Sequence, residues 1–254
     1  MPKNKYLSFI SDEHLLWCVS ELHNSYSKAR GQLTEKKFYK NKIDIFKLRF
    51  DKEFNDLSEE ELIKFEISRQ IDKSVNNAIG TFHENILGGI KGFEKGSLSG
   101  FDIKAKDNSL FADVKNKHNT MNSSSAESLF QKLSRYADDY KNATCYWVQI
   151  LSTDSFDEKW FSIINGKEYS HSRVRKISGD QFYTLLTGNK TALFELNQSL
   201  KIVIKDHLKS TESTLISENS AAAEITKKAT TGKRKILDQI AFDNYAYYFG
   251  FDSL

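Results

Sequence analysis

Two aspartates and a lysine near the middle of the chain have the residue types and the spacing of a metal-assisted hydrolytic site. Asp102 precedes Asp113 by 11 positions, and Lys115 completes the run Asp113-Val114-Lys115. Two carboxylates near the ends of paired strands can converge on Mg²⁺, which prefers oxygen ligands and keeps several waters. Such a cation neutralises a phosphate, lowers the pKa of a bound water and orients in-line attack. The spacing therefore predicts metal-dependent phosphodiester hydrolysis.

The segment that carries these residues predicts a β-hairpin, because two short strand-like runs, 100–104 and 110–115, flank the polar turn 106–109. Side chains alternate between the two faces of a strand. On the second run this alternation separates Leu110, Ala112 and Val114 from Phe111, Asp113 and Lys115. Lys115 is thus expected beside Asp113, where its ammonium can contact the attacking water or the scissile phosphate. The alternative interpretation is that these are surface charges on a hairpin.

A long helix is predicted upstream of the hairpin. Ser58 and Glu61 form an S-x-x-E capping box, and apolar residues then recur about every four positions as far as Ile86. The pattern predicts one helix, or two with a break, that ends near Gly88, followed by a glycine-rich loop over residues 88–100. Glu84 lies near the end of this helix, where it can approach the aspartates as a further ligand or an outer carboxylate.

Downstream of the hairpin, a second S-x-x-E pattern at Ser124 and Glu127 predicts a capped helix, and residues 144–151 read as a buried strand. Strand, helix and strand in this order predict a parallel crossover within one sheet. The sequence predicts five further features: a helix over 12–30, a strand over 160–164, a turn at 165–166, a polar loop or linker over 209–231 and an aromatic C-terminal helix from 236 to 251.

Positive charge is segregated along the chain, although the net charge is only +3. Residues 1–50 carry ten basic and five acidic side chains, and residues 201–235 carry eight and four. Such clusters favour contact with nucleic-acid phosphates, and the alternative is a solvated face. Basic side chains can also pair with guanine edges. The candidate DNA-binding residues are Arg173, Arg175, Lys176, Asn116, His118, Asn122 and Ser123.

These elements predict an α/β fold of mixed α+β character, with a central mixed β-sheet flanked by helices. We expect a single domain, 1–254, with a helical N-terminal part (1–57), a catalytic core (about 58–165) and a DNA-contacting C-terminal part (166–254). No apolar run approaches 18 residues, which excludes a transmembrane helix. The two cysteines form no disulfide framework, so a reducing cytoplasm is the expected location.

The order of these residues resembles a known family. Glu84, then Gly100-Phe101-Asp102, then residues 112–119 are similar to the PD-(D/E)-x-K nuclease core. More narrowly, the chain resembles the Type II restriction endonucleases that cut GGNCC sites. The likeness is closest from residue 101 to 133, and residues 177–183 are similar to a segment common after the core. One departure is that Gly100-Phe101, and not proline, precedes Asp102.

The resemblance implies Mg²⁺-dependent cleavage of double-stranded DNA that leaves 5′-phosphate ends, with Mn²⁺ as a substitute. It also implies a homodimer on a near-palindromic site and a methyltransferase that protects host DNA in a prokaryotic cell. Carried over residue by residue, Asp102 and Asp113 become metal ligands, and the Val114 carbonyl completes the metal shell. Lys115 becomes the lysine that orients water or contacts phosphate, and Glu84 becomes a further carboxylate of the site.

Two other functions remain open from the sequence. One is a repair or recombination nuclease that reads DNA structure, which would share the metal site and differ in substrate. The other is a catalytically silent DNA-binding module, for which clustered carboxylates near phosphate have no evident use. No G-x-x-x-x-G-K-[ST] motif is present, so ATP-driven translocation is not expected.

Overall fold

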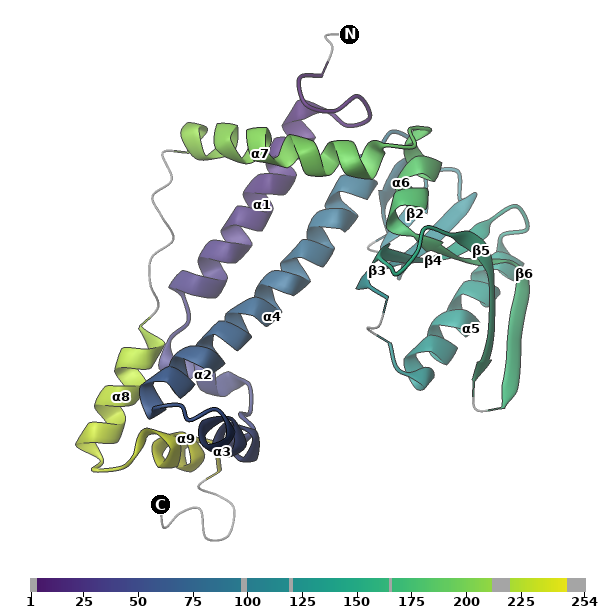
Figure 1. Ribbon diagram of the computed structural model, residues 1–254. Helices are drawn as coiled ribbons and strands as arrows, with labels where there is room; N and C mark the ends of the chain where they lie inside the picture. Colours follow the sequence, from purple (N-terminus) through teal and green to yellow (C-terminus); the bar gives the residue numbers. More distant parts are fainter. Residues whose placement is uncertain (1–3, 97–99, 119–120, 165, 212–219, 246–254) are drawn as a thin grey trace. The chain divides into compact units, whose positions relative to one another are not determined.

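The computed structural model describes residues 4–96, 100–118, 121–164, 166–211 and 220–245 of the chain (Figure 1). The chain forms two compact units. We call residues 1–22 and 79–213 the sheet unit, and residues 23–78 and 214–254 the helical unit. Helices α1 (Asp12–Gly31) and α4 (Glu59–Gly88) each contribute residues to both units. The expectation of a single domain in three consecutive parts stays a prediction.

The sheet unit is built on a six-stranded mixed sheet in the order β1-β2-β3-β4-β6-β5. The strands are β1 (Phe93–Lys95), β2 (Ile103–Ala105), β3 (Leu110–Lys117), β4 (Thr144–Leu151), β5 (Asp157–Ile164) and β6 (Lys167–Ser178). The central strands β3, β4 and β6 are parallel, while β1 pairs antiparallel with β2, β2 with β3, and β5 with β6. The predicted mixed sheet flanked by helices is confirmed.

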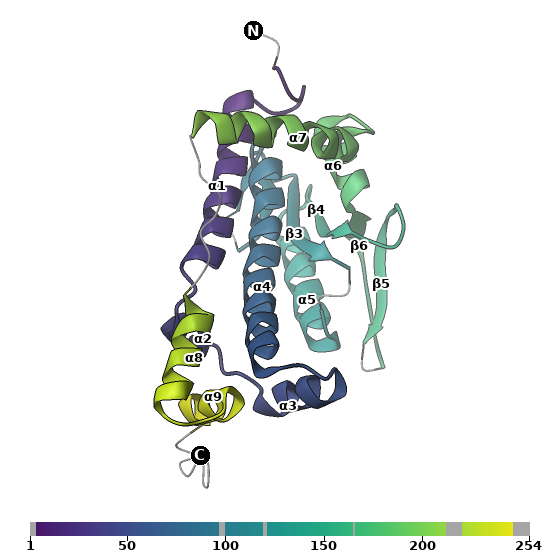
Figure 2. The same cartoon turned by 60° about the vertical axis from the view of Figure 1, so that its left-hand side comes forward.

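Helices cover both faces of this sheet, seen from a second side in Figure 2. On one face, α5 (Ser123–Asp139) packs Leu129 and Leu133 against Phe111 of β3 and Cys145 of β4. The other face packs against α6 (Gly179–Thr187), α7 (Ala192–Ser210) and the sheet-unit parts of α1 and α4. Both faces are therefore buried, as a central parallel sheet requires.

The hairpin prediction is confirmed by the antiparallel pairing of β2 with β3, in which Ile103 faces Ala112. Alternation along β3 also holds, because Val114 joins the core on one face and Phe111 the core on the other. β4 runs parallel to β3 after α5, so the predicted crossover is confirmed as well. Between β2 and β3, Asn108 has a positive φ of 60°, a conformation that asparagine tolerates in turns.

The long upstream helix is confirmed as one continuous element, α4. Its predicted capping box is formed: the Ser58 N–H donates to Glu61 Oε2 at 2.9 Å, and the Glu61 N–H donates to Ser58 Oγ at 3.3 Å. These reciprocal bonds satisfy N–H groups that the first turn of a helix leaves without intrahelical partners. The cap fixes where α4 begins.

The helical unit packs the remaining helices around its own apolar core. Parts of α1 and α4 pack with four further helices: α2 (Glu35–Lys40), α3 (Ile45–Phe54), α8 (Ala221–Thr231) and α9 (Ile236–Tyr245). Phe38, Leu48, Leu62, Ile225 and Ile240 form the centre of this core, and each is at most 1% exposed. None of the helices in the described residues is long and apolar enough to cross a membrane.

Two predictions about termini and loops are wrong in detail. α5 is capped by Asn122, whose Oδ1 accepts the Ser125 N–H at 2.9 Å, and not by the predicted box that starts at Ser124. Asparagine is among the best capping residues, and its β-region backbone starts the helix earlier. The glycine-rich segment is not all loop, because residues 93–95 gain hydrogen bonds as β1 by pairing with β2.

The predicted linker over 209–231 is also wrong in part. Residues 221–231 form α8, where Ala221, Ile225 and Ala229 recur at helical spacing and are buried. Residues 212–219 of that linker lie outside the described residues. The predicted C-terminal helix is present as α9 up to Tyr245, and its remaining residues lie outside the described part of the chain.

Candidate active site

Asp102 lies in the bend that leads into β2, where its carboxylate faces the backbone of β3. Its Oδ2 accepts the Val114 N–H at 2.7 Å, and its own N–H donates to the Ala112 carbonyl at 3.1 Å. Burial raises the pKa of Asp102, and the negative charges of Asp113 and Glu84 raise it further, against the opposing bond from Val114. Asp113 and Glu84 thus lie close enough to Asp102 for their charges to affect the pKa of its carboxyl group.

Asp113 sits in the middle of β3, and only 8% of the residue is exposed. The Lys115 ammonium lies 2.5 Å from its Oδ1, and the Lys132 ammonium lies 3.6 Å from its Oδ2. Within the described residues, Oδ1 has this ionic contact but no hydrogen bond of regular geometry. Carboxylate oxygens such as these are the ligands that hard divalent cations prefer.

Glu84 lies near the end of α4, and its negative charge raises the pKa of Asp102. Its Oε2 pairs with the Lys95 ammonium at 3.2 Å, and Lys95 also donates to Asn85 Oδ1 at 2.8 Å. The charge of Glu84 therefore acts on Asp102, while the Glu84 carboxylate itself forms an ion pair with Lys95. Its sequence-based role as a further ligand stays a prediction.

The donor set fits a hard divalent cation. Among the described residues no group of three His, Cys, Asp or Glu side chains is arranged to hold a metal by itself. Asp102 and Asp113 supply two carboxylates, and the carbonyl of Val114, the residue after Asp113, is a third oxygen. Mg²⁺ is commonly bound by one or two carboxylates and retains waters, so this small oxygen set suits it.

Lys132 on α5 is a site residue that the sequence analysis missed. Besides Asp113, its ammonium contacts the Gly100 carbonyl and lies 4.2 Å from the centre of the Phe101 ring. It therefore connects the segment before Asp102 to the carboxylate of Asp113. The available signal was its spacing, three residues after Leu129 and four before Tyr136, which places a lysine on the sheet-facing side of the helix.

A groove of about 490 Å³ opens in front of Asp113 and Lys115. The first turns of α5 line its other side with the hydroxyl side chains Ser124, Ser125 and Ser128 and with Lys132. The N-terminus of a helix favours anions, because its free N–H groups and dipole are positive. Ammonium groups, hydroxyls and a helix N-terminus on two walls make this groove suitable for a phosphate.

The predicted DNA-binding residues fall into two sets. Asn116 and His118 lie at the end of β3, and Asn122 and Ser123 lie at the start of α5. These four residues are close in sequence to the residues that line the groove, and Asn122 is occupied as the helix cap. Their role toward DNA stays a prediction.

The basic residues of β6 contact other parts of the sheet unit. The Arg173 guanidinium donates to the carbonyls of Tyr140 and Lys141 at 2.9 and 2.6 Å, so it provides donors for the backbone that follows the end of α5. Arg175 pairs with Asp157 at 2.6 Å, and Lys176 pairs with Glu158 at 2.8 Å. None of the three lines the groove beside Asp113. Base recognition by these residues stays a prediction.

Comparison with known proteins identifies the family. A profile of the Eco47II restriction endonuclease family matches residues 7–209. The chain belongs to this family. It is 39% identical over 251 residues to the Type II restriction enzyme Sau96I of Staphylococcus aureus, covering 95% of this chain and 96% of that protein. It is 30% identical over 210 residues to the Type II restriction enzyme Eco47II of Escherichia coli, covering 78% and 87%.

The matched span of the Eco47II family includes the hairpin with Asp102, Asp113 and Lys115, as well as α5 with its groove. The chain is therefore a Type II restriction enzyme, a site-specific deoxyribonuclease that acts on double-stranded DNA. The suspected restriction endonuclease family is confirmed.

Proposed function

We propose that this enzyme hydrolyses phosphodiester bonds in double-stranded DNA with Mg²⁺, at a short palindromic GGNCC-like site, leaving 5′-phosphate ends. The observation that carries the proposal is the ion pair of Asp113 with Lys115 in the wall of one groove, with Asp102 hydrogen-bonded to the backbone of Val114 between them. Mn²⁺ is expected to substitute, because it shares the preference for oxygen ligands. The likeness to two Type II restriction enzymes supports the nuclease chemistry, and the sequence resemblance supports the site.

Each proposed site residue has a distinct task. Asp102 and Asp113, together with the Val114 carbonyl, would hold the divalent cation, and Glu84 would add negative charge beside them. When bound, the cation supplies charge neutralisation at the phosphate and a lower pKa for a coordinated water. Lys115 orients the attacking water or contacts the scissile phosphate from the same face of β3. The hydrolysis uses no covalent intermediate, because water attacks phosphorus directly.

The proposed biological setting follows from the double-strand chemistry. Two copies of the chain form a homodimer, because a two-fold axis matches the symmetry of a palindromic site and gives one active site per strand. The enzyme would act in the cytoplasm of a prokaryotic cell, where a cognate methyltransferase protects host DNA. The methyltransferase is a functional partner and need not bind the enzyme.

Digestion of an unmethylated plasmid of known sequence tests this proposal. Purified protein is incubated with Mg²⁺, with Mn²⁺ or with EDTA, and the fragment ends are sequenced. The expected result is discrete fragments that end within GGNCC and carry 5′-phosphates, with no cutting in EDTA. Fragments ending at another repeated site would contradict the proposed specificity, and cutting in EDTA would contradict the proposed metal dependence.

A further inference from the structure

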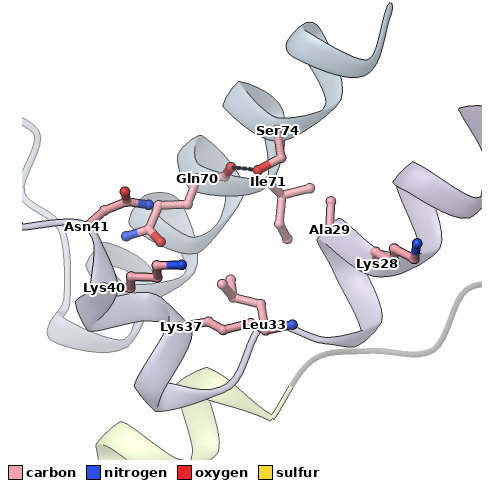
Figure 3. Close-up of a pocket in the computed structure, with 9 residues that line it drawn as sticks. All are labelled: Lys28, Ala29, Leu33, Lys37, Lys40, Asn41, Gln70, Ile71 and Ser74. Atoms are coloured by element: carbon pink, nitrogen blue, oxygen red, sulfur yellow. Dashed lines mark hydrogen bonds between the residues drawn. The ribbon is translucent and has the colours of Figure 1, made fainter. Parts of the chain in front are cut away.

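The helical unit contains a pocket of about 220 Å³ between the end of α1, the helix α2 and the middle of α4. Figure 3 shows that α1 contributes Lys28, α2 contributes Lys37 and Lys40, and α4 contributes Gln70 and Ser74 around the same space. The apolar part of the wall includes Ile71. The pocket lies within a single unit, so its lining is defined by that unit alone.

Three lysines line this pocket, and none of them is paired with a carboxylate in the described part of the chain. Among the described residues, Lys28, Lys37 and Lys40 form no ion pair, and Lys37 donates to the neutral Gln32 Oε1 at 3.1 Å. The nearby acid Glu35 is paired elsewhere, with Lys228 at 2.8 Å. Like charges around one small space repel one another, and an anion between them removes that cost.

The floor of the pocket carries a buried polar atom that lacks a partner. Gln70 is 6% exposed, and its Nε2 donates to the Phe38 carbonyl at 3.3 Å and to Glu66 Oε1 at 3.0 Å. These two acceptors fix which end of the amide is nitrogen. Its Oε1 has no hydrogen-bond partner among the described residues. A buried acceptor in this state costs stability until a donor reaches it.

An anion offsets only the charge of the lysines, because Gln70 Oε1 is itself an acceptor and needs a donor. A lysine ammonium has three donors, so it can donate to Gln70 Oε1 and to an anion at the same time. The pocket is large enough for one phosphate group with water, and residues 1–50 carry twice as many basic as acidic side chains. The enzyme acts on DNA, whose backbone presents such anions at regular spacing.

We propose that this pocket binds one phosphate of the DNA backbone, so that the helical unit holds DNA in addition to the catalytic groove of the sheet unit. The inference rests on the proposed function, because it takes duplex DNA as the ligand. Contact with phosphate gives affinity and register without reading bases. Binding through this pocket is therefore independent of the sequence of the duplex.

The first test removes the positive charge of the pocket. A variant with Lys28→Ala, Lys37→Ala and Lys40→Ala is compared with one carrying Lys64→Ala, Lys73→Ala and Lys227→Ala. The control set consists of exposed lysines of the same unit that do not line the pocket, so the change in net charge is equal. Binding to duplexes with and without the site is followed by fluorescence anisotropy in EDTA over a range of salt concentrations.

We expect the pocket variant to bind both duplexes about tenfold more weakly. The plot of log affinity against log salt should also become shallower, its slope decreasing in magnitude by about 0.9, which is the contribution of one phosphate. The control variant should keep the wild-type slope. Equal losses in the two variants would overturn the inference, because the effect would then be one of net charge. Wild-type behaviour of the pocket variant would overturn it as well.

A second pair of variants tests the pocket without removing a lysine. Ser74→Asp adds a carboxylate at the exposed edge of the pocket, whereas Ser68→Asp makes the same change at an exposed position outside the lining on the same helix. We expect Ser74→Asp to weaken DNA binding about tenfold, since a carboxylate competes with phosphate for the lysines, and Ser68→Asp to have little effect. Equal effects of the two substitutions would overturn the inference.

Neutral methylphosphonates placed singly along the duplex separate this inference from the proposed function. One backbone position should lower wild-type affinity and have no effect on the pocket variant, which locates the bound phosphate. If wild-type protein binds and cuts DNA but no position shows this difference, the pocket assignment fails and the proposed function stands. If wild-type protein neither binds nor cuts DNA under any metal condition, both fail.

Discussion

At the residue scale, Asp113 combines burial with two lysines, Lys115 near one carboxylate oxygen and Lys132 near the other. The first lysine follows from the sequence, because alternation along a strand places residues two apart on one face. The second does not, because it comes from a helix 17 residues further along the chain, counting from Lys115. Its contact depends on how α5 packs against the sheet, which local patterns do not specify.

Asp113→Asn and Lys115→Ala should each lower the cleavage rate by more than about a hundredfold while largely keeping DNA binding, since each removes a group that acts at the reacting phosphate. Single-turnover cleavage and anisotropy measure the two properties separately. Lys106→Ala is the control, because this exposed lysine lies in the turn of the same hairpin and outside the groove. Near-normal cleavage by either site variant would show that the assignment is wrong.

Lys132→Ala should slow cleavage by at least about tenfold, because a small loss of alignment between Asp102 and Asp113 is costly in the transition state. Lys132→Arg retains the charge and should recover part of the rate. Arg135→Ala on the same helix serves as the control, because it lies outside the groove. The expected signature is a loss in kcat with little change in DNA affinity. Cleavage by Lys132→Ala at the wild-type rate would remove Lys132 from the site.

At the element scale, the sequence predicted the hairpin, α4 and the crossover through α5, because their periodicity and turns are local signals. The cap of α5 was misplaced by two residues, because Ser124 also satisfies the S-x-x-E pattern and only the backbone geometry favours Asn122. β1 was missed because it is held by hydrogen bonds to β2, and the residues of β1 alone carry no pattern that predicts this pairing. Long-range pairing is the information that periodicity lacks.

The assignment of Asn122 as a helix cap gives a prediction that separates it from DNA recognition. Asn122→Ala should lower the free energy of unfolding by about 1 kcal/mol, whereas Asn122→Ser retains a capping oxygen and should cost less. Urea unfolding measures this difference. If recognition depended on the amide of Asn122, both substitutions would alter the cleavage site equally. If Asn122 acts as a cap, the loss of stability follows capping ability and the site of cleavage is unchanged.

At the scale of the whole molecule, the fold class was predictable and the division into two units was not. The expected boundaries followed the chain, with a helical part up to residue 57 and a core from about 58 onward. The structure groups residues 23–78 with 214–254 in one compact unit, because apolar residues of α8 and α9 bury themselves against α2, α3 and α4. Helical spacing identifies an apolar face but does not say which distant helix covers it.

The proposed homodimer predicts what a mixed dimer does. Wild-type chain and Asp113→Asn chain are produced together with different tags, and the mixed species is purified. On supercoiled plasmid it should yield nicked circles, since each active site cuts one strand. The control is a dimer of two wild-type chains that carry the same two different tags, and it should yield linear DNA. Recovery of no mixed species, or linearisation by it at the wild-type rate, would contradict a dimer with one active site per strand.

The interleaved course of the chain restricts how the gene can vary. The chain passes from the sheet unit to the helical unit after residue 22, returns after residue 78 and leaves again after residue 213. A single recombination crossover within the gene therefore cannot exchange one unit and leave the other intact. Related genes can trade the whole helical unit only through several coordinated crossovers, so the two units are expected to be inherited together and to diverge by point substitution.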